Sequence, residues 1–267
     1  MKNLRPLLFF VSLLVIVGMA CSVFTGDGRS TEAPPPTKQP INNVDEPTEA
    51  PVTEAPATEA PTPTEPPTPE AQPFFTEEFD SPLSDVWSSR LFYDDSVSNP
   101  DKVKVEADNG KLVWDFDSKY VYYYVFYGAY EYEDVVVETI SNNRGKNNNN
   151  VSLICRYDPE VGWYEFNIAN NGLYSILFAK IQDNGQVQWN RIANGGSKAI
   201  KSGLETNQYY AKCEGNELTL KINGADVISI KDKKYGELSN GLVGVSVSSF
   251  NVLPVRIEMD WLKISEP

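Results

Sequence analysis

Residues 163–180 read WYEFNIANNGLYSILFAK, two segments rich in aromatic and β-branched residues on either side of Asn170-Asn171-Gly172. Such segments are typical of β-strands, and an Asn-Gly pair between them is typical of a hairpin turn. Apolar and polar residues alternate in the first segment, so one face of the strand is expected to carry Tyr164, Phe166 and Ile168 into a core. The stretch predicts an antiparallel hairpin with one buried face.

The same pattern recurs throughout residues 74–267, and no segment has the apolar spacing of an amphipathic helix. About 190 residues are enough for one sizeable core. Ten or more short antiparallel strands predict an all-β, two-sheet jelly-roll sandwich, with a closed barrel as the alternative. The segment 141–150, rich in asparagine, is predicted to be a mobile loop. The expected strands are Tyr120–Tyr127, Glu133–Ile140, Val151–Tyr157, Trp163–Ala169, Tyr174–Lys180, Tyr209–Glu214, Glu217–Ile222, Val227–Ile230, Gly241–Ser248 and Val255–Ile264.

An ordered series of short motifs runs through this domain. The motifs are Phe79-Asp80, Trp87, Gly110-Lys111-Leu112, Asp134–Glu138, Tyr164-Glu165-Phe166, Gly172-Leu173-Tyr174, Gly215–Leu218, Asn223-Gly224, Tyr235, Gly241–Gly244 and Met259–Leu262. Their order resembles the concanavalin A-like lectin/glucanase superfamily, in its laminin-G and pentraxin-like branch. The resemblance implies that the first and last strands pair, which sets Phe75–Phe79 beside Ile257–Ile264.

The start of the chain has the pattern of an export signal. Lys2 and Arg5 precede an apolar run from Leu7 to Val17, which is too short to span a bilayer and suits the core of a signal peptide. Gly18-Met19-Ala20-Cys21 resembles a bacterial lipobox. The resemblance implies that residues 1–20 are removed, that Cys21 becomes diacylated, and that the protein is held outside the cytoplasm on a bacterial membrane. The alternative is an ordinary secretory signal with an incidental Cys21.

Residues 21–73 have the composition of a linker. Thr-Glu-Ala-Pro occurs at Thr31–Pro34, Thr48–Pro51, Thr53–Pro56 and Thr58–Pro61, and aromatic residues are almost absent. Such a segment has little to bury, and its prolines favour extended polyproline II geometry. We expect a disordered stalk between the anchor and the domain at 74–267.

Cys155 and Cys213 are the cysteines that remain when Cys21 is acylated. Both fall within predicted strands of an exported domain, where an even pair favours a disulfide. Two buried free thiols are the alternative.

Composition excludes several classes of function. The chain has no histidine, so a Ser-His-Asp triad, a Cys-His pair and an ordinary zinc site are excluded. A formal net charge of -14 argues against a nucleic-acid partner. No glycine-rich phosphate loop or dinucleotide motif is present, so no cofactor and no metal site are predicted.

The resemblance also implies a possible carboxylate chemistry, that of a glycoside hydrolase, because glucanases of this family carry Glu-x-Asp-x-x-Glu. The nearest match is Glu133-Asp134-Val-Val-Val-Glu138, whose first acid is out of register. We therefore expect these acids to form a solvated face, and no catalytic residue is predicted from this motif.

A second set of residues could form a ligand-binding face instead of a catalytic site. If Tyr164 faces the core, alternation turns Trp163, Glu165 and Asn167 to the opposite face, where Arg156 and Glu138 would join them if the same sheet holds them. One ring, a guanidinium, two carboxylates and an amide suit a glycan. Tyr120, Tyr122 and Tyr124 are expected to serve packing first and a binding platform second.

The sequence therefore favours a non-catalytic protein that binds a polysaccharide or another cell-envelope partner. A glycoside hydrolase is the alternative, and a structural or adhesive spacer is the third possibility.

Overall fold

The computed structural model describes residues 72–236 and 238–267. The predicted signal peptide at 1–20, the lipidation site at Cys21 and the linker up to residue 71 lie outside the described residues. Within the described ranges, no helix is both long and apolar enough to cross a membrane.

The described chain consists almost entirely of β-strands. The strands are β1 (Phe75–Glu77), β2 (Trp87–Tyr93), β3 (Val103–Ala107), β4 (Leu112–Phe116), β5 (Val121–Tyr127), β6 (Val135–Asn143), β7 (Asn149–Asp158), β8 (Gly162–Ala169), β9 (Leu173–Ile181), β10 (Val187–Gly196), β11 (Thr206–Glu214), β12 (Glu217–Ile222), β13 (Ala225–Lys231), β14 (Leu242–Ser249) and β15 (Val255–Ser265). A short 3₁₀ turn, Pro100–Lys102, precedes β3.

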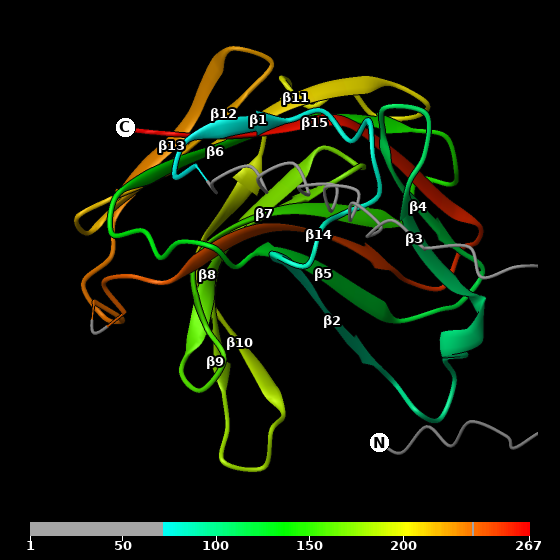
Figure 1. Ribbon diagram of the computed structural model, residues 1–267, viewed down its shortest axis with the longest axis horizontal. Helices are drawn as coiled ribbons and strands as arrows, with labels where there is room; N and C mark the ends of the chain where they lie inside the picture. Colours follow the sequence, from blue (N-terminus) through cyan, green and yellow to red (C-terminus); the bar gives the residue numbers. More distant parts are fainter. Residues whose placement is uncertain (1–71, 237) are drawn as a thin grey trace, which may run out of the picture. The chain divides into compact units, whose positions relative to one another are not determined.

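These strands form two antiparallel sheets that face one another (Figure 1). One sheet has the order β13-β12-β11-β6-β15-β4-β3, with β1 paired to β15. The other has the order β10-β9-β8-β7-β14-β5-β2. The predicted two-sheet sandwich is confirmed, and the barrel alternative is wrong because the two sheets remain separate.

The pairing of the first and last strands is also confirmed. Phe75 lies opposite Ile264 and Glu77 lies opposite Leu262 in the β1–β15 ladder.

The main core lies between the sheets and follows the predicted alternation. Tyr164, Phe166 and Ile168 of β8 are buried there, as are Val135 and Val137 of β6. The alternate residues of β8, Trp163, Glu165 and Asn167, therefore lie on the face of the sheet that points away from this core.

A disulfide joins Cys155 on β7 to Cys213 on β11, which confirms the predicted pair. The two strands belong to different sheets, so the bond links the sheets across the core.

The predicted mobile loop at 141–150 is wrong over much of its length. β6 continues to Asn143 and β7 begins at Asn149, and both side chains are buried. The amide nitrogen of Asn143 donates to the carbonyl of Gly203 at 2.8 Å, so the buried amide fixes the segment.

The seven-stranded sheet is strongly curled. Tyr122 on β5 and Trp189 on β10 are separated in the sheet by β14, β7, β8 and β9. Nevertheless, the centroids of their rings lie 5.2 Å apart. The outer face of this sheet is therefore concave, and its two sides meet through side chains.

Candidate functional site

Glu165 lies on the concave face with both carboxylate oxygens bonded. Oε1 accepts hydrogen bonds from Ser152 Oγ at 2.7 Å and Asn167 Nδ2 at 3.0 Å. Oε2 accepts from Tyr124 Oη and Trp163 Nε1, each at 3.0 Å. The side chain thus has four donors, which come from β5, β7 and β8, and the residue is 1% exposed.

Strand register brings these donors together. Ser152 of β7 lies opposite Asn167 of β8, and Ser246 of β14 lies opposite both Ser152 and Tyr124. Side chains at alternate positions of a strand share one face, so Trp163 and Asn167 flank Glu165 on β8.

The burial of this carboxylate is unusual for a residue without a charged partner. Glu165 takes part in no ion pair within the described part of the chain. Taking a carboxylate out of water is costly, and acidic residues are rarely fully buried unless they are paired. Four neutral donors offset that cost. The arrangement marks Glu165 as the candidate functional group.

Two tyrosines respond electrostatically to this carboxylate. Burial first, and then the charge of Glu165 and its hydrogen bond, raise the pKa of Tyr124 well above its ordinary value. Burial first, and then the charge of Glu165, also raises the pKa of Tyr122. Both phenols therefore stay protonated at neutral pH and remain hydrogen-bond donors.

Aromatic rings surround the carboxylate; we call Phe92, Tyr122, Tyr124, Trp163 and Trp189 the aromatic cluster. The rings of Phe92 and Trp163 stack with centroids 6.1 Å apart, and Phe92 meets Tyr124 edge to face at 5.8 Å. Offset and edge-to-face pairs are the favoured arrangements of such rings. The cluster therefore excludes water from Glu165.

An open groove of about 730 Å³ adjoins the aromatic cluster; we call it the aromatic groove. Its size suits a ligand of several sugar rings. It contains two acids and no lysine or arginine among its described lining residues. The lining is Leu91, Phe92, Tyr93, Asp94, Asp95, Tyr120, Tyr122, Gly185, Gln186, Val187 and Trp189.

The two acids of the groove differ in their surroundings. The carboxylate of Asp94 accepts hydrogen bonds from the hydroxyl and the backbone N–H of Ser96, which lower its pKa. Asp95 follows directly and is exposed.

Trp163, Glu165 and Asn167 are together, as the alternation of β8 predicts, but Arg156 lies elsewhere. An irregularity in the β7–β8 pairing between Cys155 and Asp158 accompanies a φ of 56° at Arg156. Its Nε donates to the carbonyl oxygen of Glu133 at 2.8 Å, and Nη2 lies 3.4 Å from Asp134. The expectation that Arg156 joins Trp163 is therefore corrected, because alternation breaks at this bulge.

Glu138 also lies away from the other candidates. It belongs to β6 in the eight-stranded sheet, where its carboxylate pairs with Lys263 at 3.4 Å. Asp134, from the same acidic segment, pairs with Arg156 and accepts the backbone N–H of Gly215 at 2.7 Å. These acids of the nearest glucanase-like motif therefore make structural contacts away from the concave face.

Sequence reasoning missed Ser152 as a partner of Glu165 and treated Tyr124 first as a packing residue. Both contacts depend on the order of the strands in the sheet. The alternation of β5 and β7 could be read from the sequence, but the order that places β7 beside β8 and β5 two strands beyond β7 could not.

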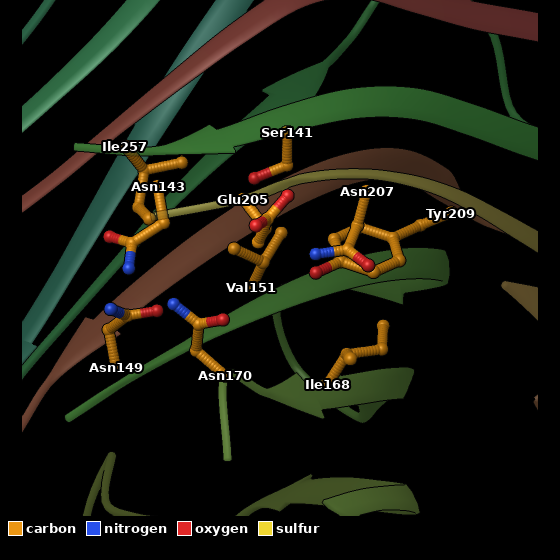
Figure 2. Close-up of a pocket in the computed structure, with 10 residues that line it drawn as sticks. All are labelled: Ser141, Asn143, Asn149, Val151, Ile168, Asn170, Glu205, Asn207, Tyr209 and Ile257. Atoms are coloured by element: carbon orange, nitrogen blue, oxygen red, sulfur yellow. The ribbon is translucent and has the colours of Figure 1, made fainter. Parts of the chain in front are cut away.

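A smaller cavity lies between the sheets and is lined by several asparagines (Figure 2). Its volume is about 10 Å³, which is room for about one water molecule. The buried Oδ1 of Asn149 has no hydrogen-bond partner there. The cavity is too small for a sugar ring. Across residues 72–236 and 238–267, no group of three or more acidic or cysteine residues could hold a metal ion.

The domain is similar in fold to solved bacterial β-glucanases. A Bacillus licheniformis β-glucanase aligns with a TM-score of 0.51 at 14% identity, over 74% of this chain and all of that one. A β-1,3-1,4-glucanase (lichenase) from a mouse hindgut metagenome aligns with a TM-score of 0.52 at 12% identity, over 73% of this chain and 99% of that one. A structure described as a native glycosidic hydrolase aligns with a TM-score of 0.51 at 14% identity, over 73% and 97%.

No protein-family model and no curated protein matches the sequence. The structural matches give the domain the concanavalin A-like jelly-roll fold. They correct the expectation of a non-catalytic binding protein, because the similar structures are glucan-cleaving enzymes.

Proposed function

We propose that the protein is a glycoside hydrolase that acts on a β-glucan at the concave face of the seven-stranded sheet, with Glu165 as a catalytic carboxylate. The observation that carries the proposal is the burial of Glu165 without a cation beneath a set of aromatic rings. The fold is the one on which the similar glucanases work.

Glycoside hydrolysis ordinarily needs two carboxyl groups, one that meets developing positive charge and one that gives a proton to the leaving oxygen. Glu165 accepts N–H bonds on both oxygens, so it suits the anionic role. The aromatic groove holds two acids, Asp94 and Asp95, and we propose that one of them gives the proton.

The substrate follows from the lining of the groove. Aromatic faces stack on the C–H faces of pyranose rings, and the absence of lysine and arginine among the described lining residues disfavours polyanionic glycans. An uncharged β-linked glucan fits this lining and agrees with the named activity of the similar lichenase.

The test is the release of reducing ends from mixed-linkage β-1,3-1,4-glucan and from β-1,3-glucan by the full chain. Glu165→Gln should lower the rate by about 100-fold or more, because a positioned carboxyl group contributes at least that much. Asp94→Asn and Asp95→Asn identify the proton donor: the variant that removes it should also lower the rate strongly, and the other should retain activity.

The matched control is Glu138→Gln, which changes a carboxylate on the other sheet and should leave the rate unchanged. Full activity in Glu165→Gln, or no hydrolysis of either glucan by the wild type, would contradict the proposal.

We also propose that Cys21 anchors the protein to a bacterial membrane, outside the cytoplasm. Support comes from the charged start, the apolar run and the small residues before Cys21. Metabolic labelling with a fatty acid should mark the wild type and not Cys21→Ser. Equal labelling of both would contradict the anchor.

A further inference from the structure

We propose that Trp189 and Tyr122 form an aromatic gate that closes the concave face over Glu165, and that the edge strand β10 must move before a glucan reaches the carboxylate. The role of the gate rests on the proposed function, but the ring contacts that form it do not depend on any activity.

The gate joins two distant parts of one sheet. Trp189 is on the edge strand β10 and Tyr122 is on β5, yet their rings are 5.2 Å apart with 33° between their planes. Tyr122 also contacts Phe250 edge to face, with centroids 6.2 Å apart. Tyr122 is thus held on the wall formed by β5, whereas Trp189 reaches it from the opposite wall.

Beneath this contact the site is closed. Trp163 and Tyr124 are fully buried beside Glu165, whereas Trp189 is 38% exposed and is the outermost ring of the aromatic cluster. In the closed arrangement a sugar can occupy the aromatic groove but cannot contact the carboxylate.

The edge strand β10 is the part of this wall best suited to move. The turn that joins it to β9 extends away from the sandwich in Figure 1, and β10 has a single neighbour, β9, in the sheet. Every β10 residue is exposed or half-buried, and its pairing shifts between Arg191 and Ala193. Edge elements with few buried contacts open at a low free-energy cost.

Opening would exchange one ring contact for another. The faces of Trp189 and Tyr122 that now meet would become free to stack on sugar rings, so substrate binding could offset the lost contact. The same two residues would then close the empty site and bind the substrate in the open one.

The test measures access to Glu165 without any substrate. The full chain is treated with a water-soluble carbodiimide and an amine, and the rate at which the Glu165 carboxyl becomes an amide is followed by peptide mass spectrometry. Trp189→Ala should raise this rate about tenfold over the wild type, because the covering ring is removed. Tyr122→Ala should act in the same direction from the other wall.

Gln188→Ala is the matched control. Gln188 is the exposed neighbour of Trp189, and its side-chain oxygen accepts a hydrogen bond from Gln182, away from the aromatic groove. Labelling of Glu138, on the other sheet, should be the same in all variants, and thermal unfolding establishes that each variant is folded. If Trp189→Ala does not fold, Tyr122→Ala, which removes the ring on the other wall, carries the test.

Unchanged labelling of Glu165 in the folded gate variants would overturn the gate even if the wild type hydrolyses glucan. Faster labelling in a protein that cleaves no glucan would keep the gate and remove the proposed function. The two proposals therefore fail separately.

Discussion

At the scale of single residues, Glu165 and Arg156 show two ways of burying a charge. Arg156 is nearly enclosed but has the carboxylate of Asp134 and the carbonyl of Glu133 as partners. Glu165 has four neutral donors and no ion pair in the described chain. Burying a carboxylate without an ion pair costs stability, so a residue with only a structural role would not need one. The buried carboxylate of Glu165 therefore indicates a chemical role.

Ser152 and Ser246 provide a matched pair of substitutions. They lie opposite one another on β7 and β14, and both are fully buried. Ser152 donates to Glu165, whereas the hydroxyl of Ser246 has no hydrogen-bond partner. Ser152→Ala should lower the free energy of unfolding by about 2 kcal/mol, and Ser246→Ala should change it by less than about 0.5 kcal/mol. Urea denaturation measures both, and equal effects would contradict the assigned network.

Buried tyrosines predict alkaline sensitivity. Burial raises the pKa of Tyr209, and burial together with Asp232 raises that of Tyr164. The unfolded chain releases these protons near pH 10, whereas the folded chain retains them. Stability is therefore fully present below about pH 10 and falls as pH rises further. Urea denaturation at pH 8 and pH 11 should show the loss, and Tyr209→Phe should show a smaller one. An equal loss in Tyr209→Phe would contradict this assignment.

At the scale of elements, strands that alternate clearly were predictable and strands with mixed faces were not. The hairpin of β8 and β9 and its turn follow from the sequence at 163–180. β2 and β10 were not predicted, because serines, asparagines and glycines interrupt their alternation. These two missed strands form the walls of the concave face, so the site could be predicted only in part.

The disulfide links β7 to β11, one strand from each sheet. Its 58-residue separation predicts a loss of about 4 kcal/mol in the free energy of unfolding when Cys155 and Cys213 are both replaced by alanine. Denaturant unfolding with and without a reducing agent measures this. The reductant should destabilise the wild type and leave the double variant unchanged; a wild type insensitive to complete reduction would contradict the prediction.

At the scale of the whole domain, the curl of the seven-stranded sheet decides what Glu165 can do. Alternation correctly put Trp163, Glu165 and Asn167 opposite the core face, but one strand cannot reveal how far its sheet bends. The bend brings rings from β2, β5 and β10 over β8, and it turns an expected open surface patch into a closed site. Such curvature arises from the twist accumulated over all seven strands.

The most direct test is a crystal structure of the full chain carrying Glu165→Gln, grown with a mixed-linkage glucan oligosaccharide. We predict sugar rings in the aromatic groove, an anomeric carbon facing residue 165, and Trp189 displaced from Tyr122. An oligosaccharide bound to another surface, with the ring pair still closed over residue 165, would contradict the account.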